Sequence, residues 1–402
     1  MKIQVILDDL YPNGMALAAR IHLYARGFIQ GGHKVFILIP RPYEKYGKIP
    51  KNPDPHGFVD NVEFKYSALT TVRSKYFIIR QLVDIFSLLN AAVITFQKRK
   101  QTDVFLVVSS IAVQILLFKL IALMTNKVII LEKSEFPFIF EKKNQLASIY
   151  QKFYIRHIYK LFDGIIVISK SLEAYFMTKK KPGAKLLLVP IIVDPQVFFD
   201  TQTPPILNDE VVYAGILNQS KDGILDIIDA FSRLNQIYKD KKLVLMGDIE
   251  ASECKEGIYD LISKNNIRDN VIITGYVARS VMVDRLKKAE VLILAKPASL
   301  QSEHSFPTKV GEYLATGKPV VLTNVGCINQ YLTDGINAFI AEPNNIESLS
   351  GKLLEVYSDY KRSLEIGQRG QQVAINQFDY RSQSKVIIDF FTERINKKRG
   401  DA

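Results

Sequence analysis

The segment with the clearest chemical potential runs from Ser305 to Val320 and reads SFPTKVGEYLATGKPV. We expect a short helix over residues 309–315, with Thr308 as its N-cap. The N-terminus of a helix offers unpaired N–H groups and a partial positive charge, so Ser305, Thr308 and this end of the helix suit a phosphate group. Glu312 falls on the first turn, where its carboxylate can accept two hydrogen bonds from a ribose cis-diol. A solvated glutamate favoured by the helix dipole is the alternative.

Two lysines are candidate cations for such a phosphate. Lys221 lies in the loop ILNQSKDG that follows an apolar run at residues 211–214, and Lys309 lies near the start of the expected helix. When a bond to a phosphate group breaks and negative charge grows on the phosphate, a fixed cation stabilises that charge. Losing one such contact typically costs about 10²- to 10³-fold in rate. Solvated lysines are the alternative for both residues.

The elements that position these residues follow an alternating strand and helix pattern in two halves. Apolar runs predict strands, with helical stretches between them, at residues 3–7, 34–39, 104–108, 128–131, 165–168 and 186–189, and again at 211–214, 243–246, 271–273, 291–294 and 320–323. Such alternation predicts an α/β protein with two Rossmann-like domains, each a doubly wound parallel sheet. Ligands of such folds bind at the carboxyl ends of the strands, in a cleft.

The domain boundaries follow from changes in composition. We expect an N-terminal domain at residues 1–195, a Pro-rich linker at 196–209 and a C-terminal domain at 210–376. The last stretch, 377–402, contains the amphipathic run SQSKVIIDFFTERI and should pack back on the N-terminal domain. The apolar window 104–124 is about as long as a membrane span. The favoured interpretation is a buried strand that ends at Ser109-Ser110, followed by a core helix.

Charge is concentrated in the first half of the chain. The 402 residues carry 53 Lys and Arg against 41 Asp and Glu, and residues 1–200 hold 28 of these basic but only 15 of these acidic side chains. Basic residues interleave with aromatic and aliphatic ones at 152–160, which suits an anionic membrane surface. Nucleic acid is not expected, since no binding module is recognisable. A merely solvated basic face is the remaining alternative.

Metal and disulfide chemistry are not expected. Two cysteines cannot form a disulfide framework and indicate a reducing, cytoplasmic compartment. The five histidines are scattered, and the acidic turn at 247–250 fits a strand end better than a metal site. We expect the first apolar run not to be a secretory signal, because Asp8 and Asp9 interrupt it.

Several segments together resemble retaining glycosyltransferase family 4, a GT-B family of the glycosyl transferases group 1. Its pattern is E-x7-E followed by A-x-G-x-P-V, and Glu312 matches the second glutamate, while His304 stands at the first. The other matching segments are 162–169, 188–194 and 212–215 followed by Lys221. The resemblance implies that Gly215 belongs to a pyrophosphate loop, with Ile216 where an Arg commonly follows, and that His304 faces the donor sugar.

On the acceptor side, Gly14 lies in the first strand-to-helix loop, where a missing side chain lets backbone approach a phosphate or sugar. The resemblance further implies that Glu132 or Glu135, after the strand at 128–131, orients the acceptor hydroxyl or the donor, and Glu135 is the preferred choice.

The resemblance implies an enzyme that moves a sugar from a UDP- or GDP-sugar to a saccharide or lipid-linked saccharide in capsule, exopolysaccharide or lipopolysaccharide synthesis. Lys221, Glu135 and His304 are the expected catalytic residues, and no cofactor or metal is expected. The enzyme would attach peripherally to the inner face of the cell membrane. A GT-B nucleotide-sugar 2-epimerase and a non-catalytic donor-binding subunit are the alternatives.

Overall fold

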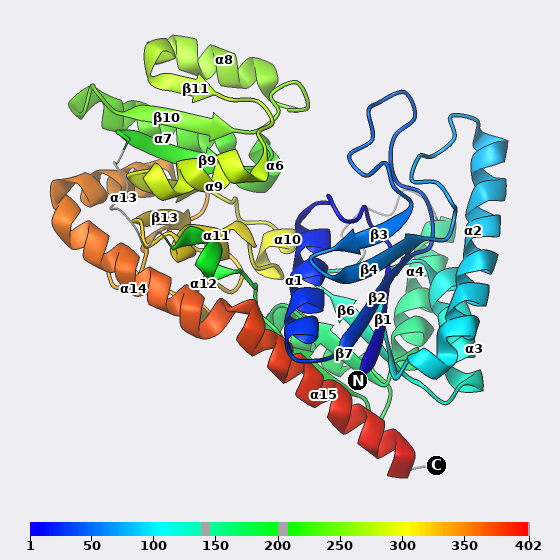
Figure 1. Ribbon diagram of the computed structural model, residues 1–402. Coiled ribbons are helices and arrows are strands. Elements are labelled where there is room, and N and C mark those ends of the chain that lie inside the picture. The colour runs from blue at the N-terminus through cyan, green and yellow to red at the C-terminus, as the bar shows by residue number, and fades with distance from the viewer. Residues whose placement is uncertain (138–144, 200–207, 401–402) are drawn as a thin grey trace. The chain divides into compact units, whose positions relative to one another are not determined.

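The computed structural model of the chain describes residues 1–137, 145–199 and 208–400, and it divides into two compact units. Unit 1 comprises Met1–Ile192 and Tyr380–Ala402, and unit 2 comprises Val193–Asp379 (Figure 1). The divisions lie within about three residues of the boundaries at 195 and 376 expected from the sequence. Most of the expected linker, residues 200–207, lies outside the described residues.

Unit 1 is built on an eight-stranded sheet of order β3-β4-β2-β1-β5-β6-β7-β8. Every neighbouring pair is parallel except β3 and β4, which form an antiparallel hairpin at one edge. The strands are β1 (Lys2–Leu7), β2 (Lys34–Ile39), β3 (His56–Val59), β4 (Val62–Tyr66), β5 (Val104–Val108), β6 (Val128–Lys133), β7 (Gly164–Val167) and β8 (Lys185–Leu188). All six strands expected in this half are confirmed.

Helices cover both faces of this sheet. They are α1 (Ala16–Gln30), α2 (Phe77–Gln97), α3 (Ala112–Met124), α4 (Gln145–His157), α5 (Lys170–Met177) and α15 (Tyr380–Gly400), with short 3₁₀ turns at Lys98–Gln101 and Ile158–Leu161. The C-terminal helix α15 packs against α1 (Figure 1). Ile3, Val5 and Leu7 of β1 share a core with Phe390 and Phe391 of α15, whereas Gln4 points the other way and donates to Thr95 of α2.

The apolar window 104–124 folds as expected into the buried strand β5 and the helix α3 rather than into one continuous helix. The break is slightly later than predicted, because α3 begins at Ala112 and its N-cap is Ile111. Ser109 still contributes, since its hydroxyl accepts a hydrogen bond from the Ile111 N–H at 3.1 Å.

Unit 2 is built on a six-stranded, fully parallel sheet of order β11-β10-β9-β12-β13-β14. The strands are β9 (Glu210–Ala214), β10 (Lys242–Met246), β11 (Val271–Ile273), β12 (Val291–Leu294), β13 (Val320–Thr323) and β14 (Phe339–Ala341). The five strands expected from the sequence are confirmed, and β14 is an addition. The strand order reverses at β9, which lies between β10 and β12. The loop after such a strand is where ligands bind in open α/β sheets.

The helices of unit 2 connect these strands. They are α6 (Gln219–Asp222), α7 (Ile224–Ile237), α8 (Lys255–Lys264), α9 (Arg279–Lys288), α10 (Leu300–Glu303), α11 (Lys309–Ala315), α12 (Ile328–Tyr331), α13 (Ile346–Ser358) and α14 (Tyr360–Phe378), with 3₁₀ turns at Pro195–Phe198 and Arg268–Asn270. The helix α11 has the bounds expected from the sequence.

Candidate functional site

The loop after β9 is shaped by a glycine. The Gly215 N–H donates to the carbonyl of Met246 on the neighbouring strand at 2.8 Å. A Cβ built at Gly215 would overlap Nζ and Cε of Lys309 and would lie 2.8 Å from the Tyr213 hydroxyl. The absence of a side chain at Gly215 therefore leaves the space in which the end of the Lys309 side chain lies.

Lys309 is held in this space by two side chains from the β9–α6 region. Its ammonium donates to Oδ2 of Asp222 at 2.8 Å and to the hydroxyl of Tyr213 at 2.9 Å, and it lies 4.6 Å from the centre of the Tyr213 ring. Burial, reinforced by the Asp222 charge, raises the pKa of Tyr213, so this phenol stays neutral. The result is a cation fixed at the carboxyl end of the central strand by neighbours that leave its side chain 24% exposed.

Lys221 lies on the same loop but outside this network. It is an exposed residue of α6, and its backbone N–H donates to Oδ1 of the N-cap Asn218 at 3.1 Å. Its ammonium has no ion-pair or hydrogen-bond partner among the residues that the structure describes. Lys221 therefore remains available to an incoming anion, while Lys309 has a partner already.

Glu312 lies on the first turn of α11, and it has a cationic partner that the sequence did not suggest. Its Oε1 accepts a hydrogen bond from Nη2 of Arg279 at 2.8 Å. Arg279 is the first residue of α9, which follows the loop after β11. This ion pair gives Glu312 a structural role beside the expected diol contact.

The residues before α11 differ from the expectation in one respect. Thr308 occupies the N-cap position of α11, as predicted, but its backbone angles are helical (φ −61°, ψ −29°) and its side chain makes no capping hydrogen bond. An N-cap needs extended angles to turn its hydroxyl toward the helix amides, and here the turn has already begun, since the Val310 N–H donates to the carbonyl of Pro307. Ser305 donates its hydroxyl to the carbonyl of Ser302 at 3.2 Å, and His304 is the half-buried C-cap of α10.

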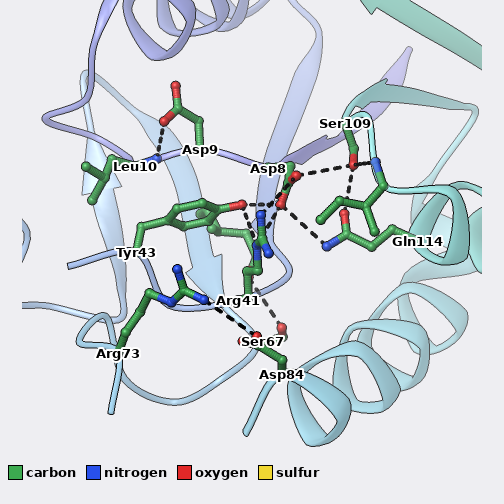
Figure 2. Close-up of polar contacts among 12 residues, drawn as sticks. Asp8, Asp9, Leu10, Arg41, Tyr43, Ser67, Arg73, Asp84, Ser109 and Gln114 are labelled. Carbon is green, nitrogen blue, oxygen red and sulfur yellow. Dashed lines mark hydrogen bonds and ion pairs between the residues drawn. The ribbon is translucent and has the colours of Figure 1, made fainter. Parts of the chain in front are cut away.

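Unit 1 carries a polar network at the carboxyl end of its own central strand (Figure 2). Asp8 follows β1 directly and accepts hydrogen bonds from Nε of Arg41 at 3.1 Å, from the Tyr43 hydroxyl, and from Ser109 and Gln114 at 3.4 Å. These partners come from the segments after β2 and β5 and from α3. The network was not anticipated, because its members are scattered over about a hundred residues of sequence.

Asp9 lies beside this network, and its electrostatics differ from those of an ordinary aspartate. Burial raises the pKa of the Asp9 carboxyl, and the negative charges of Asp8 and Glu135 add to the effect against an opposing hydrogen bond from the Leu10 N–H. Glu135 is exposed after β6. The structure therefore brings Asp9 and Glu135 into electrostatic contact at this edge of the sheet.

Glu132, the other glutamate considered for the acceptor side, is structural. It is buried and pairs with the equally buried Arg20, whose Nε lies 2.9 Å from Glu132 Oε1. Gly14 also has an internal reason for its identity, because a Cβ there would overlap the carbonyl oxygen of Leu10 and the side chain of Ala18. Its requirement for glycine thus follows from packing within its own loop.

Within the described residues, no group of three or more His, Cys, Asp or Glu side chains is arranged to hold a metal. The acidic turn after β10 is engaged otherwise, since Glu250 pairs with Lys255 at 2.7 Å. Neither Cys254 nor Cys327 is in a disulfide.

Comparison with known proteins bears on the second unit most directly. Residues 208–373 match the family described as Glycosyl transferases group 1, and this range holds every candidate site residue of unit 2. Over 231 residues the chain is 26% identical to the lipopolysaccharide 1,2-N-acetylglucosaminetransferase of Salmonella typhimurium. That alignment covers 54% of this chain and 58% of the relative, so the chain spans less than two thirds of the relative's length.

Solved structures resemble the whole chain. The sucrose-phosphate synthase of Thermosynechococcus elongatus superposes with a TM-score of 0.74 at 15% identity, covering 97% of this chain and 98% of the other. Anabaena Alr3699/HepE, solved in complex with UDP-glucose, superposes with a TM-score of 0.70 at 13% identity, covering 98% of this chain and all (100%) of the other.

The protein thus has the GT-B fold of glycosyltransferases. Its second unit matches the family described as Glycosyl transferases group 1 over residues 208–373.

Proposed function

We propose that the protein is a retaining glycosyltransferase that moves a sugar from a UDP- or GDP-sugar to a saccharide or lipid-linked saccharide during synthesis of a cell-surface polysaccharide. The observation that carries this proposal is the cation at the β9 loop: Lys309 lies over Gly215 at the strand-order reversal, inside the group 1 domain. The UDP-glucose complex of a structural neighbour and the lipopolysaccharide enzyme among the relatives support the donor and the pathway class.

The leaving diphosphate accounts for the cations of the loop. Lys309 is paired with Asp222, and a phosphate oxygen would compete with this carboxylate for the ammonium. Lys221, exposed on α6, would supply a second cation. These fixed charges would stabilise the negative charge that grows as the sugar departs. The proposed reaction uses no metal and no cofactor.

The other donor contacts are proposed for α11 and the segment before it. The Glu312 carboxylate would accept hydrogen bonds from the ribose hydroxyls. His304 would face the donor sugar, and Ser305 would face the phosphates. On unit 1, the acceptor would bind at the edge that carries Asp9 and Glu135, with Glu135 orienting its hydroxyl.

The proposal places the enzyme on the cytoplasmic face of the cell membrane, attached peripherally. The basic excess of residues 1–200 supports this, because each cation near an anionic surface contributes about 1 kcal/mol. Nucleic acid is not among the proposed partners.

The test is a panel of UDP-, GDP- and ADP-sugars. Donors that bind the folded state raise the melting temperature, and a donor at about 100 times its Kd stabilises by about 2.7 kcal/mol. Donors that bind are then assayed for turnover, with Lys309→Met as the site variant and Lys361→Met, on the exposed surface of α14, as the matched control.

Transfer or hydrolysis of one donor, lost in Lys309→Met and kept in Lys361→Met, supports the proposal. Formation of an epimer would instead identify a nucleotide-sugar 2-epimerase. Binding without turnover would identify a non-catalytic subunit, and absence of binding across the panel would overturn the donor assignment.

A further inference from the structure

The helix α2 presents its apolar side chains to the outside of unit 1. Most of its large apolar residues are at least 39% exposed, namely Phe77, Ile78, Ile79, Leu82, Ile85, Phe86, Leu89, Val93 and Phe96, whereas Ile94 is buried. The side chains that it buries include Ser87 and Thr95, both fully buried. A surface helix of a water-soluble protein normally has the opposite arrangement.

The polar side of α2 is tied to the sheet. Thr95 accepts a hydrogen bond from Gln4 of β1 at 2.7 Å, and Asn90 donates to the carbonyl of Ser67, just after β4, at 2.7 Å. Asp84, the one acidic residue of the helix, lies 3.8 Å from the Arg73 guanidinium (Figure 2). The helix therefore cannot rotate to bury its apolar residues without breaking these contacts.

The neighbouring helix α3 extends the same surface. It packs beside α2 in unit 1 (Figure 1), and its side chains Val113, Leu116, Leu120, Leu123 and Met124 are each at least 48% exposed. We call this surface, made of the exposed apolar side chains of α2 and α3, the α2–α3 face. A contiguous apolar surface of this kind marks an interaction site.

Cations flank the face at both ends of α2. Lys75 and Arg80 lie at its start, and Lys98, Arg99 and Lys100 follow its end. Two of these cations lie over aromatic rings of the helix, Arg80 over Phe77 at 5.4 Å and Arg99 over Phe96 at 4.2 Å. An apolar stripe with basic residues at its margins is typical of a helix that lies in the interface of an anionic bilayer.

Length and composition alone would also allow the segment Phe77–Gln101 to cross a membrane, and only 17% of its apolar window is buried. The contacts of α2 favour lying on the bilayer, because a crossing helix would have to leave Gln4 and Ser67 and carry Asp84 into the hydrocarbon. A second copy of the chain would cover apolar side chains equally well, but it would gain nothing from the cations at both ends.

We propose that the α2–α3 face inserts into the interfacial region of an anionic membrane and holds unit 1 there. The inference rests on the membrane attachment proposed above and deepens it: attachment depends on apolar insertion as well as on charge. It predicts binding that survives salt, since salt screens charges but does not weaken apolar burial.

The chain contains no tryptophan, so a single introduced Trp reports on one position. Leu89→Trp places the probe on α2, and Val386→Trp places the control at an exposed position of α15, the helix that packs on α1. Both proteins are mixed with vesicles of phosphatidylcholine and phosphatidylglycerol whose acyl chains carry bromine, a contact quencher. The salt concentration is then raised to about 1 M, where the screening length is about 3 Å.

The expected result is quenching and a blue shift for Leu89→Trp, persisting at high salt, with neither effect for Val386→Trp. A paired variant, Leu82→Gln with Leu89→Gln, should lose at least about tenfold of its high-salt vesicle binding, whereas Val386→Gln should bind as the unmodified protein does. Both leucines are 61% exposed, so an unchanged melting temperature is expected and serves as the folding check.

Vesicle binding that disappears at high salt without quenching would overturn insertion while leaving electrostatic attachment in place. Absence of vesicle binding at any salt would overturn both. A blue shift of Leu89→Trp without lipid, with a dimer in sedimentation, would assign the face to a second copy and overturn the proposal. Sugar transfer to a soluble acceptor is measured in parallel. This assay distinguishes a failure of the glycosyltransferase proposal from a failure of the membrane proposal.

Discussion

The Lys309 ammonium lies 2.8 Å from the Asp222 carboxylate, across a gap of 87 residues in sequence, and the two meet beside Gly215. The pair neutralises a cation at the position where an anionic ligand would need it. A diphosphate would have to draw the Lys309 ammonium away from Asp222. The ion pair therefore lowers the affinity of the loop for anions. The exchange is feasible because the Lys309 and Asp222 side chains are not fully buried.

Gly215→Ala tests this arrangement. The new Cβ would overlap the end of the Lys309 side chain, which is flexible and would move away. We expect kcat to fall by about 10²- to 10³-fold, the typical cost of removing one fixed charge contact. The loss of stability should be smaller, about 1–3 kcal/mol, from the backbone angle that glycine adopts there.

The control for this substitution is Gly351→Ala. Gly351 lies on the exposed surface of α13, where a Cβ would meet open space, so the change should stabilise the helix by up to about 1 kcal/mol and leave kcat unchanged. Steady-state kinetics and urea unfolding measure both quantities. Unchanged kcat in folded Gly215→Ala would show that Lys309 has no part in the reaction.

Glu312→Gln and Arg279→Gln separate the two roles of Glu312. Each variant removes the same exposed ion pair, which is worth about 0–1 kcal/mol, so both should be nearly as stable as the unmodified protein. If the carboxylate binds the ribose diol, Glu312→Gln should weaken donor affinity at least about tenfold, the effect of about 1.4 kcal/mol, and Arg279→Gln much less.

Isothermal titration with the donor identified by the panel compares the two variants. Equal losses of donor affinity in both variants would show that donor binding depends on the Glu312–Arg279 ion pair. Unchanged donor affinity in both variants would show that Glu312 does not bind the donor.

The strands could be predicted because the central strands of parallel sheets are continuous apolar runs. The hairpin of β3 and β4 escaped prediction because it lies at the sheet edge, where polar residues such as Glu63 and Lys65 alternate with apolar ones. Its two-residue turn, Asp60-Asn61 with both φ values positive, is the signal that was available. The helix α2 was not predicted individually, and most of its large apolar residues are exposed rather than packed in the core.

The candidate site was predictable only where its residues lie close together in sequence. The local motifs gave Gly215, Lys221, Lys309 and Glu312. The partners Asp222, Tyr213 and Arg279 could not be found in this way, because the contacts join segments tens of residues apart. Thr308 shows a second limit, since its residue type favours an N-cap but does not fix its backbone angles.

Glu132→Gln, in β6, and Glu135→Gln, just after β6, test which of the two glutamates is structural. Glu132 is fully buried beside Arg20, whose guanidinium also donates to the carbonyls of Val189 and Pro190. Removing the negative charge leaves Arg20 without its counterion, and such losses cost about 3–5 kcal/mol. The exposed Glu135 should tolerate the same change within about 0.5 kcal/mol.

Urea unfolding of the two glutamine variants gives the comparison. A Glu132→Gln variant as stable as the unmodified protein would contradict the structural role. Loss of transfer in Glu135→Gln with stability intact would support its place on the acceptor side.

Asp9→Asn should stabilise the protein at neutral pH. Burial, with help from Asp8 and Glu135, raises the pKa of Asp9 above its ordinary value of 3.8. Between 3.8 and the raised pKa the native state holds a proton that the unfolded chain has lost, so the free energy of unfolding falls as pH rises through this window. Asparagine cannot ionise, and its Oδ1 can still accept the hydrogen bond from the Leu10 N–H at 2.7 Å.

Urea unfolding of Asp9→Asn and the unmodified protein across pH measures the difference. The variant should be the more stable above the window, and the two should converge as pH falls below 3.8. Asp60→Asn is the control of opposite sign, because a hydrogen bond from His22 lowers the pKa of Asp60 and its ionised form stabilises the native state. That variant should be the less stable at neutral pH. An Asp9→Asn variant that is destabilised in the same way would show that the ionised Asp9 is favoured by the fold, contrary to the raised pKa.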